Sequence, residues 1–292
     1  MDSLYHAAAL FPPDIFQTLK TLPVGFQEKI EELRVTRDKP LSVKTNEGER
    51  LLCQNRPITA RDIDHIVLSA TGGSYHSAAE TIKQGYITVK GGSRIGLCGE
   101  GAMRGGQNET LRHISSLCIR IPRPALGCAD TIFPTLCADQ FLNTLIISPP
   151  GMGKTTLLRE LVRKLSASGY RVSLVDERGE LASMYQGVPQ FDLGPRTDVI
   201  SNVTKCQAAI MMIRSMAPDI LAMDEITATA DLPAILEASG CGVSLLATVH
   251  GSGASDLKQK KMFRELFSYD IFQKAVCIEL QRGRRVYTVM DL

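Results

Sequence analysis

The stretch that decides the fold is Ser148-Pro149-Pro150-Gly151-Met152-Gly153-Lys154-Thr155-Thr156. It follows the phosphate-binding loop pattern G-x-x-x-x-G-K-[ST], except that Ser148 stands at the first glycine. The apolar run 145–147 precedes this stretch, and leucines at helical spacing follow it between positions 157 and 165. Because strand, glycine-rich turn and helix come in this order, the stretch predicts a nucleotide-binding α/β domain.

Each residue type in this loop has a physical role. Glycines let the backbone curl so that N–H groups point at phosphate oxygens, and the following helix adds a favourable dipole. Ser148 needs only a tolerable backbone angle, so its substitution removes no phosphate donor. We expect Lys154 to reach the β- and γ-phosphates of ATP as a catalytic cation, and the Thr155 hydroxyl to ligate Mg²⁺. The expected nucleotide-binding residues are Pro149, Pro150, Gly151, Met152, Gly153, Lys154, Thr155 and Thr156.

A second acidic part of the site is expected 70 residues after Lys154. The apolar run 220–223 reads as a buried strand and ends in Asp224 and Glu225. Asp224 is the predicted second Mg²⁺ ligand. Glu225 is the predicted catalytic residue that polarises the attacking water, which hydrolysis needs and binding alone does not.

Three further groups are expected at the same edge of the sheet. His250 follows the apolar run 243–248, and it would emerge near the γ-phosphate if that strand lies between the two strands above. Asp176, Glu177 and Arg178 follow the strand 172–175; they form either a solvated turn or a group that positions Mg²⁺ and water.

Arginines that could stabilise charge across a subunit boundary are not ranked by the sequence. The candidates are Arg178, Arg196 and Arg214. Asp198 is expected to cap the start of a helix.

The alternation of apolar runs and helical patterns in the second half predicts a largely parallel sheet covered on both sides. The first half predicts a smaller α+β domain, with strands near 30–35, 41–44, 86–89 and 95–97 and a helix opening at 59–62. The boundaries expected are an N-terminal domain at 1–120, a proline-containing linker at 121–130 and the nucleotide-binding domain at 131–292. Residues 99–106 are expected to form a surface loop, or else a loop that contacts nucleotide or a partner.

Composition excludes several classes of protein. The chain has 292 residues and a net charge of +2, and it has no Trp, so neither bulk charge nor stacking side chains indicate a nucleic-acid-binding protein. No apolar run reaches the ~20 residues that span a bilayer, and the start of the chain lacks a signal-peptide pattern. The eight cysteines have no C-x-x-C pair, so we expect free thiols in a reducing cytosol.

Four stretches together identify a family resemblance. They are Leu174–Leu181, Gly194–Val199, Ile213–Asp219 and Asp224-Glu225. The second half resembles the secretion-ATPase branch of the RecA/AAA-like motors, which drive type IV pili and type II and IV secretion. It more closely resembles the bacterial stage III sporulation AA family, and the segments 32–34, 39–41, 91–96 and 119–122 extend this resemblance into the first half.

The resemblance implies a Mg²⁺-dependent ATPase of endospore-forming bacteria with a RecA/AAA-like P-loop core. It implies a hexamer with nucleotide between subunits, acting in the mother cell at the cytoplasmic base of a channel into the forespore. The implied partners are other copies of this chain and the membrane proteins of the stage III complex, through which it would meet the membrane peripherally. The chain departs from the secretion-ATPase pattern at Asp224, where a glycine is common, so Mg²⁺ coordination would follow the broader ATPase class.

Two rival functions remain at this point. RecA-like cores also drive nucleic-acid-associated ATPases, and the basic clusters 258–261 and 282–285 could meet phosphates or could be ordinary solvated surface. A regulatory scaffold that binds ATP without hydrolysing it is the third candidate, and Glu225 argues against it.

Overall fold

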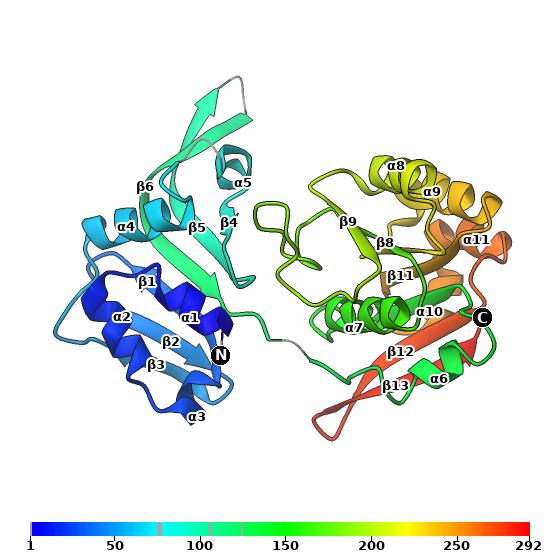
Figure 1. Ribbon diagram of the computed structural model, residues 1–292, viewed down its shortest axis with the longest axis horizontal. Helices are drawn as coiled ribbons and strands as arrows, with labels where there is room; N and C mark the ends of the chain where they lie inside the picture. The colour runs from blue at the N-terminus through cyan, green and yellow to red at the C-terminus, as the bar shows by residue number, and fades with distance from the viewer. Residues whose placement is uncertain (1, 75–77, 105–106, 124) are drawn as a thin grey trace. The chain divides into compact units, whose positions relative to one another are not determined.

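The computed structural model describes residues 2–74, 78–104, 107–123 and 125–292 (Figure 1). These residues form two compact units. The first holds residues up to Arg123 together with Ser183–Gln190, and the second holds Pro124–Ala182 and Phe191–Leu292. The border at Arg123 falls inside the expected linker 121–130, but the excursion 183–190 falls inside the range expected for the nucleotide-binding domain. Pro124, His76 and Gly105–Gly106 lie outside the described residues.

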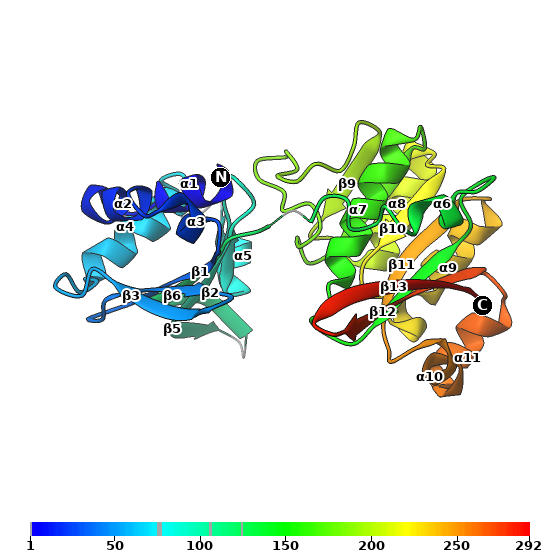
Figure 2. The same cartoon turned by 90° about the horizontal axis from the view of Figure 1, so that it is seen from below.

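The first unit is an antiparallel sheet in the order β3-β2-β1-β6-β5-β4. Figure 2 shows α1, α2 and α4 together on one face of this sheet. Buried side chains from both layers, such as Ile15, Leu33 and Ile63, form its core. The strands are β1 (Ile30–Thr36), β2 (Leu41–Thr45), β3 (Gly48–Leu52), β4 (Tyr86–Thr88), β5 (Arg94–Arg104) and β6 (Gln107–Arg120). The helices are α1 (Asp2–Ala8), α2 (Pro13–Lys20), α3 (Val24–Gln27), α4 (Ala60–Ala70) and α5 (Ala79–Lys83).

Helix α4 begins where the sequence predicts it. The Thr59 hydroxyl accepts a hydrogen bond from Asp62 N at 3.3 Å, and the Asp62 carboxylate accepts one from Thr59 N at 2.7 Å, which is a reciprocal capping box. Arg56 joins this carboxylate to that of Asp14 on α2. The cap therefore also ties α4 to α2.

The surface loop expected at 99–106 is wrong for residues 99–104, which belong to strand β5. β5 pairs with β6 as far as Arg104, and the register shifts between Cys98 and Glu100. A Cβ on Gly99 would lie 2.6 Å from the carbonyl oxygen of Arg112. The glycine is therefore needed for the close approach of two strands at a bulge, rather than for loop flexibility.

The residues 183–190 are held within the first unit by a hydrogen bond from Gly91 N to Gln190 Oε1 at 2.8 Å. An isolated bridge between Tyr185 and Val188 shapes the segment itself.

The second unit is a sheet in the order β13-β12-β7-β11-β10-β8-β9. All its pairings are parallel except the β12–β13 hairpin, as expected from strands that alternate with helices. The strands are β7 (Thr144–Ser148), β8 (Val172–Asp176), β9 (Thr197–Ser201), β10 (Ile220–Met223), β11 (Ser244–His250), β12 (Lys274–Gln281) and β13 (Arg284–Asp291). Asp198 lies in β9, so the expectation that it starts a helix is wrong.

Helices cover both faces of this sheet. On one face, Leu145 and Ile147 of β7 point into a core shared with α8, α9 and α11. Ile146, between them, is buried outside that cluster. Helix α7 contacts β7, β8 and β11. The helices are α6 (Phe133–Leu136), α7 (Lys154–Ala167), α8 (Lys205–Met216), α9 (Ala228–Gly240), α10 (Ala254–Gln259) and α11 (Lys261–Ser268). In the described part of the chain, no helix is long and apolar enough to cross a membrane.

Candidate functional site

The carboxyl ends of four neighbouring strands bring the predicted residues together. β11 lies between β7 and β10, and β8 lies beside β10, so these strands end at one edge of the sheet. Ser148, Asp224, His250 and Asp176 stand at those ends. The condition under which His250 was expected near the loop is therefore met.

The phosphate-loop pattern forms the turn between β7 and α7. Gly151 and Gly153 have φ values of 75° and 93°, which side chains with a Cβ rarely adopt. Lys154 is buried, and its ammonium donates hydrogen bonds to the carbonyl oxygens of Ser148 at 3.0 Å and Pro149 at 3.1 Å. Burial lowers the pKa of Lys154, while Asp224 and Glu225 act in the opposite direction. The lysine is thus folded over its own loop by local contacts.

Thr155 and Asp224 meet as two oxygen donors. The Thr155 hydroxyl donates to Asp224 Oδ2 at 2.9 Å, and the Thr248 hydroxyl of β11 donates to Asp224 Oδ1 at 2.5 Å. Adjacent ligands of an octahedral Mg²⁺ ion at ~2.05 Å lie about 2.9 Å apart, so the Thr155–Asp224 separation fits this cation. Across the described residues, no group of three or more His, Cys, Asp or Glu side chains could hold a metal by itself. With two protein oxygens, the Thr155–Asp224 pair would suit a cation that takes its other ligands from phosphate and water.

Glu225 is held in an unusual backbone conformation beside Asp224. Its φ of 50° lies in the left-handed region, and its N–H donates to the Thr248 hydroxyl at 2.8 Å. Ile226 N donates to the Thr248 carbonyl at 2.8 Å, so both residues are tied to β11. These bonds support a strained turn from which the Glu225 carboxylate reaches His250 and Arg178.

His250 bridges the loop lysine and Glu225. Its Nδ1 lies 2.8 Å from Lys154 Nζ, and its Nε2 lies 2.5 Å from Glu225 Oε1. Because an ammonium can only donate, this pattern assigns a neutral ring with the proton on Nε2, donated to Glu225. The imidazole therefore links the phosphate loop to the acidic pair.

Asp176 organises the loop that follows β8. Its buried carboxylate accepts hydrogen bonds from the N–H groups of Glu180, Leu181 and Ala182 at 2.8, 3.0 and 2.8 Å. Burial raises the pKa of Asp176, although these three bonds oppose the rise. Within the described residues, this carboxylate accepts its hydrogen bonds from backbone groups of its own loop, which indicates a structural anchor.

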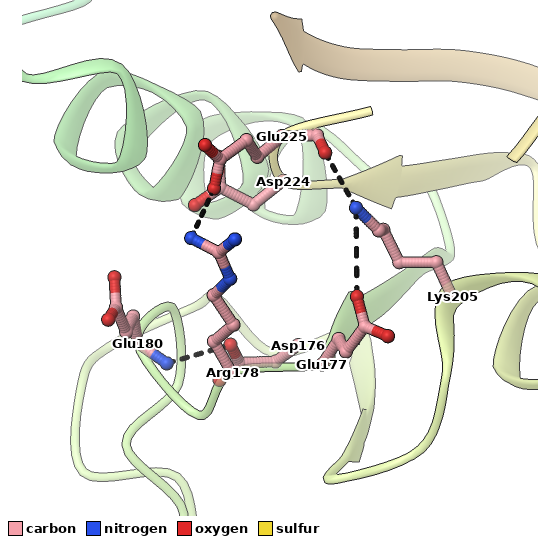
Figure 3. A pocket seen from close by; sticks show the side chains of 7 residues that line it. All are labelled: Asp176, Glu177, Arg178, Glu180, Lys205, Asp224 and Glu225. Carbon is pink, nitrogen blue, oxygen red and sulfur yellow. Dashed lines mark hydrogen bonds and ion pairs between the residues drawn. The ribbon is translucent and has the colours of Figure 1, made fainter. Parts of the chain in front are cut away.

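Arg178 and Lys205 complete a polar depression beside Glu225 (Figure 3). The Arg178 guanidinium forms an ion pair with the Glu225 carboxylate. Lys205 Nζ donates to the Glu225 carbonyl at 2.6 Å and lies 3.6 Å from Glu177 and 3.3 Å from Asp231. The depression is lined by Asp176, Glu177, Arg178, Glu180, Lys205, Asp224 and Glu225.

The structure does not bring Arg196 or Arg214 to this cluster within the chain. Arg196 donates to the carbonyl of Gly169, beyond the C-terminal end of α7, at 2.8 Å. Arg214, in the last turn of α8, lies 3.3 Å from Glu237 of α9. Both lie where α7 and α8 end, whereas the phosphate loop lies where α7 begins. Their role across a subunit boundary stays a prediction.

Two residues of the cluster were not predicted from the sequence. The Thr248 hydroxyl is hydrogen-bonded to Glu225 N and to the Asp224 carboxylate. The sequence feature that could have indicated it is its position two residues before His250, which places both on the same face of β11. Lys205 opens α8 directly after the N-cap residue Thr204. A lysine at such a position is ordinarily solvated surface, so the sequence offers little to single it out.

Three comparisons place the chain among known proteins. The family model described as "Sporulation stage III, protein AA" matches residues 12–290. The stage III sporulation protein AA of Bacillus subtilis (strain 168) is 36% identical over 298 residues, covering 98% of this chain and 93% of that protein.

Among solved structures, the pilus retraction motor PilT with bound ADP has a TM-score of 0.64 at 18% identity, covering 94% of this chain and 82% of PilT. The Legionella pneumophila ATPase DotB has a TM-score of 0.59 at 14% identity, covering 98% of this chain and 78% of DotB. These likenesses show that the fold is that of the secretion and pilus-motor P-loop ATPases.

Proposed function

Because the chain belongs to the stage III sporulation AA family, we propose that it is a Mg²⁺-dependent ATPase that powers transport or assembly at the stage III sporulation complex. Its ATPase-like fold and family membership support the class of activity. The single observation that carries the proposal is the chain of contacts from Lys154 through His250 to Glu225.

ATP is the proposed substrate of the loop between β7 and α7. The N–H groups of the first turn of α7 have no acceptor within the helix, and they would bind the phosphates together with residues Pro149–Thr156. Lys154 would exchange its loop carbonyls for β- and γ-phosphate oxygens. Thr155 and Asp224 would hold Mg²⁺, which when bound neutralises the developing charge on the phosphates.

Glu225 is the proposed group that activates water. Its carboxylate would orient a water molecule and accept its proton as the oxygen attacks the γ-phosphorus, which breaks the bond to ADP and releases phosphate. Arg178 and His250 hold this carboxylate in the structure, so they would set its direction. His250 would also report the position of Lys154, because one ring touches both.

The test is ATP hydrolysis by the full chain and by Glu225→Gln at several protein concentrations. We expect the variant to lose at least a hundredfold in turnover while still binding ATP, because only the water-activating group is removed. Glu265→Gln is the matched control, since Glu265 is exposed on α11 and should leave turnover unchanged. Turnover that is insensitive to Glu225→Gln would contradict hydrolysis at this site and favour a nucleotide-binding scaffold.

The assembly we propose is a hexamer that is peripheral at the membrane, on the mother-cell side of the forespore, and bound to membrane proteins of the stage III complex. Support comes from family membership and from the likeness to motor ATPases. Mass photometry of Glu225→Gln with and without ATP tests the oligomer, and we expect six copies with ATP. Co-expression with the stage III membrane proteins, followed by membrane fractionation, tests recruitment.

The alternative of a nucleic-acid-associated ATPase gains no support from the basic cluster 258–261. Lys260 lies 3.0 Å from the Asp256 carboxylate, and Lys258 lies over the Phe267 ring. Salt-dependent binding of DNA or RNA by the full chain would revive this alternative.

A further inference from the structure

A basic side chain from the far end of the chain lies against the phosphate loop. Arg285 is on β13, and a Cβ placed on Gly153 would lie 3.3 Å from both Cζ and Nε of Arg285. Gly153 is the N-cap of the 14-residue helix α7. The guanidinium of Arg285 therefore packs on the turn in which phosphate binding is proposed.

This position is fixed by contacts that do not involve Arg285. Tyr287, two residues along β13 and so on the same face, lies close enough to Cys128 for the two side chains to interact electrostatically. The neighbouring Gly127 N donates to Glu160 Oε1 of α7 at 2.9 Å. These two contacts connect β13 to α7 and keep the Arg285 face of the strand beside the loop.

Positive charge exceeds negative charge at the turn where Arg285 lies. The amino end of α7 carries partial positive charge, and Lys154 adds a full one. Among the described residues, the other cations near the loop have carboxylates: Arg178 pairs with Glu225, and Lys205 lies near Glu177 and Asp231. No carboxylate of the described residues pairs with Arg285, which is exposed. Three positive sources at one turn favour an anion there.

The order of the strands determines the side from which Arg285 approaches the phosphate loop. Glu225 and His250 follow β10 and β11, on one side of β7, whereas β12 and β13 lie on the other side. The γ-phosphate is proposed to lie beside Glu225. A cation from β13 therefore approaches the opposite end of the triphosphate.

We propose that Arg285 is a nucleotide-binding residue that contacts the α- and β-phosphates of ATP and ADP. This inference rests on the proposed function, because it takes the loop as the nucleotide site. A guanidinium can donate two parallel hydrogen bonds to phosphate oxygens, so Arg285 would add both charge and orientation. Arg285 is the last residue of the basic cluster 282–285, which spans the turn between β12 and β13.

The test is equilibrium binding of fluorescently labelled ADP to the full chain, with competition by unlabelled ATP and ADP. We expect Arg285→Ala to weaken both nucleotides about tenfold and equally, because the contact is to phosphates that both carry. Arg285→Gln, which keeps much of the stem, should give a similar loss. Arg284→Ala is the matched control, since it removes the adjacent exposed arginine from the opposite face of β13, and it should change neither affinity.

Other outcomes would each exclude the inference in a distinct way. Weakening of ATP alone would place Arg285 at the γ-phosphate, and unchanged affinities would make it a packing contact only. Thermal unfolding is also measured without nucleotide. If both Arg285 variants unfold at the wild-type temperature, a loss of nucleotide affinity does not come from misfolding. If both unfold at a lower temperature, the inference fails and Arg285 has a structural role. A wild-type chain that binds neither nucleotide would overturn the proposed function and this inference with it.

Discussion

The two sheets of this molecule arrange charged groups in opposite ways. In the first unit, Arg56 is shared by the carboxylates of Asp14 and Asp62, and the group closes on itself between two helices. In the second unit, Lys154 and Glu225 are brought from separate strand ends and joined through one imidazole. The first arrangement stabilises the fold, and the second leaves groups that a ligand can reorganise.

Strand direction explains the difference. The described strands of the first sheet pair antiparallel, so consecutive strands end at opposite edges and their polar ends are dispersed. In the second sheet, β7, β11, β10 and β8 run parallel and end at one edge. Converging ends favour a binding site, as in other open α/β sheets.

Removing the charge of Lys154 should have the largest effect on the function of the second unit. We expect Lys154→Met to lower ATP turnover by about a hundredfold or more, because one preorganised cation at the transferring phosphate is lost. The free energy of unfolding should change little, since a buried cation is replaced by an apolar side chain of similar length. Steady-state hydrolysis and thermal unfolding measure the two effects.

Lys164→Met is the control for this variant, because Lys164 lies near the other end of α7 and pairs with Asp130 at 2.6 Å. It should retain turnover. A Lys154→Met chain that hydrolyses ATP at the wild-type rate would show that the second unit, like the first, uses its charges for folding.

Asp62→Asn should have the converse effect on the first unit. The variant weakens the capping box and the Arg56 ion pair, so we expect α4 to lose about 1–3 kcal/mol of local stability while ATP turnover is unchanged. Hydrogen-exchange mass spectrometry of peptides spanning α4 in the full chain measures the loss. Asp64→Asn, on the exposed side of the same helix, should leave exchange unaltered.

Lowering the pH should destabilise the first unit through the Asp62 carboxyl, with a smaller effect than the substitution. The Arg56 guanidinium, with help from Thr59, holds the pKa of Asp62 well below its usual range despite burial. The unfolded chain therefore binds this proton more readily. The stabilisation should be complete above about pH 5 and should be lost as pH falls through about 4 toward the folded pKa. The difference in urea midpoint between wild type and Asp62→Asn should shrink over that interval, and a constant difference would exclude this titration.

Several features of the second unit could be predicted from residues alone. The phosphate loop, the acidic pair after 220–223 and His250 each follow a short apolar run, and such runs mark buried parallel strands. The position of His250 depended on strand order, which no local pattern contains. The structure supplies that order by placing β11 between β7 and β10.

The residues that were missed act across the sheet rather than along the chain. Thr248 contacts Asp224 from the neighbouring strand. Arg285 was noted only as part of the basic cluster 282–285, and its contact with Gly153, more than a hundred residues away in sequence, was not foreseen. Gly99 was misread because a glycine needed for close strand approach looks, in sequence, like one needed for flexibility. Each depends on register or packing, which single-sequence patterns do not encode.

The excursion at 183–190 means that one cut cannot divide this polypeptide into its two bodies. The chain passes from one unit to the other at three points, after residues 123, 182 and 190. A fragment beginning at residue 124 would carry Gln190 without Gly91, and its counterpart would lack a piece of itself. The second unit is therefore interrupted in sequence by a segment of the first. To separate the second unit along this boundary, residues 183–190 must be deleted and replaced by a linker.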